Sequence, residues 1–179
     1  GSSAASDVYK RQGLLDVAIG VSSVFAADPV RTWNVPLYWV CAIDDEVDPA
    51  LPLDVIVYAE PCAWRRLMFD ALLAAGRDFR VTVTSPNVGV ISAAVENGLG
   101  VALLPADNIN PHTMRVIALA PAGNAALSVN YGLFAVPRQT ESIRATVELL
   151  SEGFHLMTQP RVKGLSLCDT PPPTPAPAQ

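Results

Sequence analysis

The segment 79–105 has a pattern of apolar and polar positions that predicts a strand, a helix and a second strand. β-Branched residues alternate with polar ones at its start, which favours a pleated strand with Val81 and Val83 on one face. Ser85 and Pro86 follow in the order expected of a helix N-cap and a first helical residue. Apolar residues then recur at helical spacing before the Asn-Gly pair that ends the helix: Val88, Ile91, Ala94 and Val95.

A similar unit precedes this one along the chain. Residues 55–58 predict a strand, and the helix after it carries an apolar stripe that Gly76 terminates: Trp64, Leu67, Met68, Ala71, Leu72 and Ala75. The order from 55 to 104 is therefore β-α-β-α-β. Because such crossovers are right-handed, we expect a parallel sheet with both strand-to-helix turns, 59–62 and 84–87, at one edge. The fold class is α/β.

The remaining apolar segments complete this picture. Strands are predicted at 14–20, 35–43, 116–119 and 127–136, and Thr140 is a suitable cap for a last helix. That helix has one apolar stripe: Ile143, Val147, Leu150, Phe154 and Met157. Residues 1–12 look like a tag or cloning artefact, and the proline-rich tail 158–179 is predicted to be disordered.

Composition excludes several classes of protein. No apolar run among the 179 residues approaches the ~18–20 residues of a membrane span. Residues 13–157 contain eight arginines, no lysine and fifteen acidic residues, a net charge of −7. Phosphate contacts dominate non-specific binding to nucleic acids, so this segment by itself is a poor DNA binder. We expect a cytoplasmic location.

The candidates for site chemistry are few. The three cysteines and two histidines lack ligand spacing, so neither a disulfide framework nor a metal site is expected. The acidic run 44–48 is a solvated loop or, alternatively, an acid–base or Mg²⁺ site, and Cys62 is a packing residue or a reactive thiol at a helix start. Arg138 and Arg144 are exposed charges or anion contacts. With no nucleophile elbow, P-loop or dinucleotide fingerprint, we expect neither an enzyme nor a cofactor.

Two motifs resemble one known family. Ser85 begins a pattern that continues A-A-V-x-x-G-L-G-V-A-L-L-P from Ala93 to Pro105, and Gly13 begins a G-x-L-D-x-A-I segment. Together they resemble the effector-binding domain of LysR-type transcriptional regulators, over residues 13–157. The resemblance implies a periplasmic-binding-protein-like (type II) fold with a complete second lobe, 46–136, and a partial first lobe, 13–45 with 137–157.

The resemblance also implies a function. A small organic effector would bind between the lobes, and DNA would be contacted only through an N-terminal winged helix-turn-helix that this sequence does not contain. The full-length protein is expected to be a homo-oligomer. Two alternatives share the fold: a transport-type solute-binding protein and an enzyme on a prephenate-dehydratase-like scaffold.

Two segments are candidates for contacting the effector. Ligands of open α/β sheets bind beyond the carboxyl ends of the strands, near helix N-termini, and this places the turn after the strand 80–84 in the site. The same turn matches the family's second-lobe effector loop: Thr84, Ser85, Pro86, Asn87 and Val88. A first-lobe contact point is matched by Gly20, Val21 and Ser22.

Overall fold

The structure is a computed structural model that describes residues 15–119, 127–138 and 140–158. The predictions for residues 1–12, the tail beyond residue 158 and the Met157 side chain lie outside the described part. The helices and strands elsewhere match their predicted positions to within a few residues.

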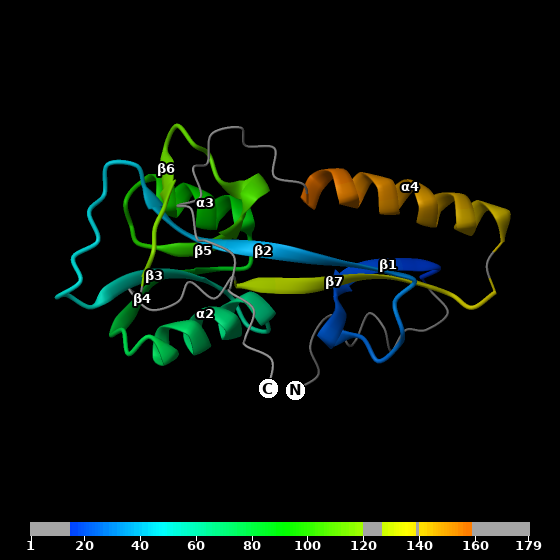
Figure 1. The fold of residues 1–179 in the computed structure, drawn as a ribbon, viewed down its shortest axis with the longest axis horizontal. Coiled ribbons are helices and arrows are strands. Elements are labelled where there is room, and N and C mark those ends of the chain that lie inside the picture. The colour runs from blue at the N-terminus through cyan, green and yellow to red at the C-terminus, as the bar shows by residue number, and fades with distance from the viewer. Residues whose placement is uncertain (1–14, 120–126, 139, 159–179) are drawn as a thin grey trace, which may run out of the picture.

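Two long strands, β2 (Arg31–Ala42) and β7 (Ser128–Ala135), run between two halves of the molecule (Figure 1). β2 changes partners along its length. Residues 31–36 pair antiparallel with β7, whereas 37–40 pair with β5 (Ala102–Pro105) and 40–42 with β6 (Met114–Val116). Pro36 occupies the point where the partner changes, a position where the missing N–H of proline is tolerated. One strand thereby belongs to both halves.

The first half is built on the outer part of this sheet. β1 (Val17–Val21) pairs antiparallel with β7, and the short 3₁₀ turn η1 (Ser22–Val24) follows it. Helix α4 (Glu141–Thr158) lies along the same strands (Figure 1). The hydroxyl of Thr140 accepts a hydrogen bond from the Ile143 N–H at 3.3 Å, which confirms the predicted cap. The α4 side chain of Phe154 packs on Trp33 and Tyr131 of the two crossing strands.

The second half contains the two helix units read from the sequence. Its elements are β3 (Leu53–Tyr58), α2 (Ala63–Ala74), β4 (Phe79–Ser85), α3 (Val88–Glu96), β5, η2 (Ala106–Asn108) and β6. The two helices lie on opposite sides of the strands (Figure 1). Each covers its own buried cluster, with Met68 and Leu72 of α2 in one and Ile91 and Val95 of α3 in the other.

The predicted parallel sheet is only partly correct. β3 and β4 pair in parallel, but the third strand touches β3 through a single parallel bridge, Val55 to Val101. Beyond that bridge β5 pairs antiparallel with β2. The crossing strand supplies a full ladder of partners that the local β-α-β pattern could not reveal, because β2 comes from a distant part of the sequence.

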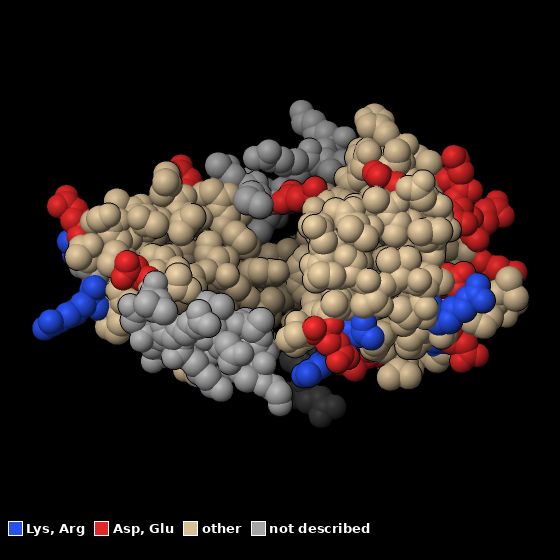
Figure 2. All heavy atoms as spheres, turned by 180° about the vertical axis from the view of Figure 1, so that it is seen from behind, with Lys and Arg blue, Asp and Glu red and all other residues tan. Residues whose placement is uncertain are grey.

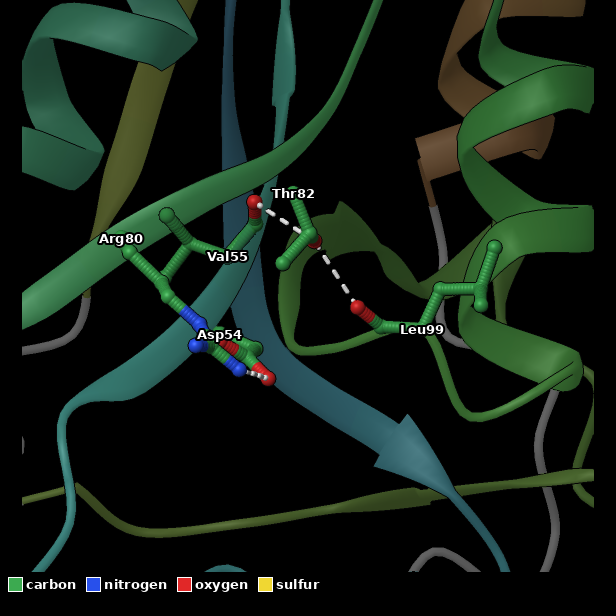
Figure 3. Close-up of polar contacts among 5 residues, drawn as sticks. All are labelled: Asp54, Val55, Arg80, Thr82 and Leu99. Atoms are coloured by element: carbon green, nitrogen blue, oxygen red, sulfur yellow. Dashed lines mark hydrogen bonds and ion pairs between the residues drawn. The ribbon is translucent and has the colours of Figure 1, made fainter.

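The predicted alternation in β4 is also wrong. Val81 is paired with Val55 and Val83 with Ile56, with a register shift between them. Val55 and Ile56 belong to opposite core clusters, so Val81 and Val83 face opposite sides of the sheet. The extra residue is Thr82, whose hydroxyl lies 2.8 Å from the Leu99 carbonyl and 3.3 Å from that of Val55 (Figure 3). A hydrogen bond to a neighbouring loop thus stabilises the bulge.

The two glycines of the motif Gly98-Leu99-Gly100 serve different structural purposes. Gly98 has a φ of +70°, and its N–H and that of Leu99 bond the carbonyls of Val95 and Ala94, the pattern of a Schellman end to α3. Gly100 has a φ of +144°, and a Cβ there would lie 2.5 Å from the Asp54 carbonyl oxygen. The first glycine ends the helix, and the second lets the chain approach β3 closely enough to bond it.

Candidate functional site

The candidate site lies at the carboxyl ends of β3 and β4. Tyr58 and Ser85 are register partners at these ends, and the Ala59 N–H donates to the Ser85 carbonyl at 3.0 Å. The two strand-to-helix turns therefore share one edge of the sheet, as predicted. Seen from behind, the surface is hollowed between the two halves (Figure 2).

The turn before α3 is built differently from the prediction. The helix begins at Val88, and its N-cap is Asn87, whose Oδ1 accepts from the Gly89 N–H at 2.7 Å. Ser85 is not the cap, and Pro86 is not the first helical residue. Ser85 stays in β4 because its carbonyl is held by Ala59, and asparagine caps a helix as well as serine does.

Ser85 nevertheless organises this turn. It is 7% exposed, and its Oγ accepts from the Asn87 N–H at 3.1 Å. The Asn87 N–H is thus not free to bind a ligand. Thr84, Pro86, Asn87 and Val88 are exposed. The exposed side chains of this turn are open to a ligand, whereas Ser85 is buried.

In the first-half segment, Gly20 has a packing role. A Cβ at Gly20 would lie 2.5 Å from the ring of Phe25, which stacks on Phe134 with centroids 4.2 Å apart. Val21 packs against the core cluster that α2 covers. The Ser22 Oγ is buried and has no hydrogen-bond partner in the described part of the chain. Of the three predicted residues, Ser22 has the chemistry to contact a ligand.

A series of contacts connects the two predicted segments. Val21 is the register partner of Tyr131, and Trp64 lies near enough to the Tyr131 hydroxyl to lower its pKa. The Trp64 ring meets Tyr58 edge-on, with centroids 5.1 Å apart, and Tyr58 is paired with Ser85. The series crosses from β1 in the first half to β4 in the second.

Sequence reasoning found only part of this series. It assigned Trp64 to a core stripe, and Trp64 does pack against that core cluster, but it gave Tyr58 and Tyr131 no role. One signal was present for Tyr58, which is the last residue of its strand and so stands at the ligand-binding edge of a parallel sheet. For Tyr131 no local signal exists, because its place opposite Val21 depends on the pairing of distant strands.

Burial raises the pKa of the two tyrosines of this site. Desolvation raises the pKa of Tyr58 well above its ordinary value, and it also raises the pKa of Tyr131 although Trp64 acts in the opposite direction. Tyrosine hydroxyls are already protonated at neutral pH, and the raised pKa extends that state to more alkaline pH. The Tyr58 hydroxyl is buried without a hydrogen-bond partner among the described residues. An unpaired buried hydroxyl of this kind costs about 1–3 kcal/mol.

A metal site has no supporting chemistry in the described residues. No group of three His, Cys, Asp or Glu side chains there could hold a metal ion, and Cys41 and Cys62 are free thiols. Two surface grooves lie elsewhere: one of about 440 Å³ between α4 and the start of β2, and one of about 300 Å³ lined by Arg77 and Arg115. Neither is lined by the predicted effector contacts, but Arg144, one of the two candidate anion contacts, lines the first groove. No helix in the described ranges is long and apolar enough to cross a membrane.

Comparison with known proteins gives a consistent result. The family described as the LysR substrate binding domain matches residues 7–155. The match begins six residues before the predicted start of ordered structure at Gly13. A curated relative is PecT, an HTH-type transcriptional regulator of Dickeya dadantii (strain 3937), 28% identical over 107 residues. That alignment covers 60% of this chain and 34% of PecT, so the chain corresponds to about a third of the regulator's length.

Solved structures share the fold. Full-length HypT of Salmonella typhimurium, a hypochlorite-specific LysR-type transcriptional regulator, superposes with a TM-score of 0.68 at 18% identity, over 84% of this chain and 56% of HypT. The regulatory domain of Synechocystis PCC6803 CcmR in complex with 2-PG gives a TM-score of 0.57 at 12% identity, over 77% of this chain and 73% of that one. The expected α/β fold of the periplasmic-binding-protein type is confirmed.

Proposed function

Since the chain belongs to the family of LysR substrate-binding domains, we propose that it senses a small-molecule effector in the hollow between its two halves and thereby controls transcription. The proposal assigns binding to this chain and no catalysed reaction. The effector contacts are Thr84, Ser85, Pro86, Asn87 and Val88 on one side and Gly20, Val21 and Ser22 on the other. Of these, Gly20 acts through the packing of Phe25.

One observation supports this site above all others. The contacts Val21–Tyr131–Trp64–Tyr58–Ser85 connect the two segments from opposite halves. Within this series the Tyr58 hydroxyl is buried without a partner among the described residues, and so is the hydroxyl of Ser22 next to Val21, whereas buried polar groups normally have partners. A ligand between the halves would touch both ends of this series and would therefore couple the position of one half to that of the other.

The proposal extends to the whole regulator. We assign residues 13–45 and 137–157 to its first lobe and 46–136 to its second. DNA contact belongs to a winged helix-turn-helix outside this chain, in keeping with the net charge of −7 over 13–157. The PecT relative is described as an HTH-type regulator. A homo-oligomer in the cytoplasm, where the DNA is, completes the assignment, and the effector is a small organic molecule.

A ligand screen that includes a variant with a blocked site tests the proposed effector site. The 179-residue chain and two variants are screened by thermal shift against a library of small organic metabolites. Thr84→Trp places a large side chain at the exposed mouth of the site, whereas Leu73→Trp places the same side chain on the far end of α2, at a position 69% exposed. We expect compounds that stabilise the wild type and Leu73→Trp but not Thr84→Trp.

One result of the screen would contradict the proposed site. If every stabilising compound acts on Thr84→Trp as strongly as on Leu73→Trp, the effector binds somewhere other than this site. Stabilisation follows mass action, so a compound at one hundred times its Kd raises the unfolding free energy by about 2.7 kcal/mol, which is well within detection.

A further inference from the structure

The groove that Arg77 and Arg115 line, called here the arginine groove, lies at the amino ends of β3 and β4. Arg77 stands two residues before β4, and its guanidinium donates to the Pro49 and Asp48 carbonyls in the loop before β3. The candidate effector site lies at the other ends of these strands. Because β3 has six residues, roughly 17 Å of extended chain separates the two places. The arginine groove is therefore a separate location, at the end of the molecule away from β1 and α4 (Figure 1).

Both guanidinium groups of the arginine groove contact only neutral acceptors. Like Arg77, Arg115 donates to a carbonyl of the loop, from its Nη2 to Asp45 at 2.6 Å. Neither arginine forms an ion pair within the described ranges, where the three ion pairs belong to other arginines. The acidic side chains of the loop, at positions 44, 45, 46 and 48, are not among the residues that line the groove. Two positive charges therefore border this groove without a carboxylate in its lining.

The rest of the lining is mostly apolar. Four apolar side chains, one from the loop and three from β6 and the residues after it, stand beside the arginines: Val47, Val116, Ile117 and Leu119. The volume of about 300 Å³ is at the lower end of the range for small-molecule sites. A guanidinium binds a carboxylate through charge-assisted hydrogen bonds, and apolar walls favour a hydrocarbon body because they remove it from water. The lining thus matches a small molecule that has both parts.

We propose that the arginine groove is a second ligand site, which takes a small monocarboxylate with an apolar body. The carboxylate accepts hydrogen bonds from the guanidinium groups of Arg77 and Arg115, each of which has five N–H donors and uses only some of them on the loop carbonyls. The body of the ligand packs on the apolar walls. Its contacts include the loop through which the chain passes from the crossing strand β2 to β3. This site goes beyond the proposed effector function and does not depend on it.

Three small probes test the class of ligand. Hexanoate, hexanamide and acetate are titrated into the 179-residue chain, and their dissociation constants are measured by saturation-transfer NMR. Hexanamide has the length of hexanoate without its charge, and acetate has the charge without the hydrocarbon chain. We expect hexanoate to bind at least about tenfold more tightly than either of the other two. A hexanoate affinity equal to that of hexanamide or of acetate would overturn the proposed class, and so would the absence of hexanoate binding.

Four variants test the location. Arg77→Gln and Arg115→Gln should each weaken hexanoate at least about tenfold and leave hexanamide within about twofold, because only the charged ligand uses the guanidinium. Arg66→Gln is the matched control, since it removes the same charge from an exposed position on α2, and it should change neither affinity. Ala118→Trp places a bulky side chain in the groove from an exposed lining position and leaves both arginines intact. It should abolish hexanoate binding, and it keeps the test valid where an arginine variant fails to fold.

The contrary outcomes distinguish this site from the effector site. If hexanoate binds Ala118→Trp as tightly as the wild type, the arginine groove is not its site. Loss of binding in Thr84→Trp but not in Ala118→Trp would place hexanoate at the effector site, which refutes the second site and supports the proposed function. If the arginine variants lower the urea midpoint without changing the hexanoate affinity, Arg77 and Arg115 only hold the loop, and the proposal is wrong.

Discussion

Replacing Gly100 with alanine introduces a methyl group where the chain passes closest to β3. An ideal Cβ at this position lies 2.5 Å from the Asp54 carbonyl oxygen and 2.8 Å from its carbonyl carbon. Both are backbone atoms, so no side-chain rotation relieves the overlap. The φ of +144° is, in addition, a conformation that alanine rarely adopts.

The expected loss has two parts. Backbone strain at such a φ costs about 1–3 kcal/mol. Moving the chain away from Asp54 weakens two hydrogen bonds, from Val101 N–H to the Asp54 carbonyl at 2.8 Å and from Ile56 N–H to the Val101 carbonyl at 2.9 Å. At about 1 kcal/mol each, these bring the total to about 3–5 kcal/mol. That is a large share of the roughly 5–15 kcal/mol that stabilises a typical domain.

Urea unfolding followed by circular dichroism measures this loss. Gly98→Ala is the matched control, because its φ is also positive but nothing lies within 4 Å of its Cβ. It should cost only about 1–2 kcal/mol, the strain of a single left-handed residue. A Gly100→Ala variant no less stable than Gly98→Ala would show that the close approach to Asp54 does not constrain this turn, and the reasoning would be refuted.

Three further predictions concern a helix cap, an ion pair and the net charge of the chain. Asn87→Ala should lower the free energy of unfolding by about 1 kcal/mol while Asn87→Asp preserves it, as measured by urea titration, because only the cap to Gly89 is lost; equal losses in both variants would argue against the cap. Arg80 holds the pKa of the Asp54 carboxyl below its ordinary value, so their ion pair stabilises the fold above the unfolded-state pKa and loses that effect as pH falls through the lower folded-state pKa. The difference in urea midpoint between the wild type and Arg80→Gln should therefore shrink between about pH 6 and about pH 3; a constant difference would contradict this. Finally, the chain alone should show no salt-dependent micromolar binding to duplex DNA in fluorescence anisotropy, given its net charge.

The candidate site could be found from the sequence only in part. Position along a strand predicted that the turn 84–88 lies at the ligand-binding edge, because the carboxyl ends of parallel strands meet there. The details of that turn depended on competition between two good caps, Ser85 and Asn87, and the Ala59 N–H decided it by holding Ser85 in the strand. Such a contact between separate turns has no signature in either segment alone.

The sequence by itself determined the elements of this protein. Periodicity places the stripes of α2 and α3, and Gly76 and Gly98 end those helices because only glycine readily takes a positive φ there. These are local properties, fixed by neighbours a few residues apart. The family resemblance was equally local, since the G-L-G pattern reflects one helix end and one close approach.

Only the tertiary structure decided how these elements meet. The crossing of β2 from β7 to β5, the bulge at Thr82 and the contacts from Val21 to Ser85 all join segments tens of residues apart. The sequence carries little information about which strands pair, because every strand backbone offers the same donors and acceptors to any partner. The choice of partner rests on how the apolar faces of the whole chain can be buried together, and so the aromatic residues of the candidate site became apparent only in the folded protein.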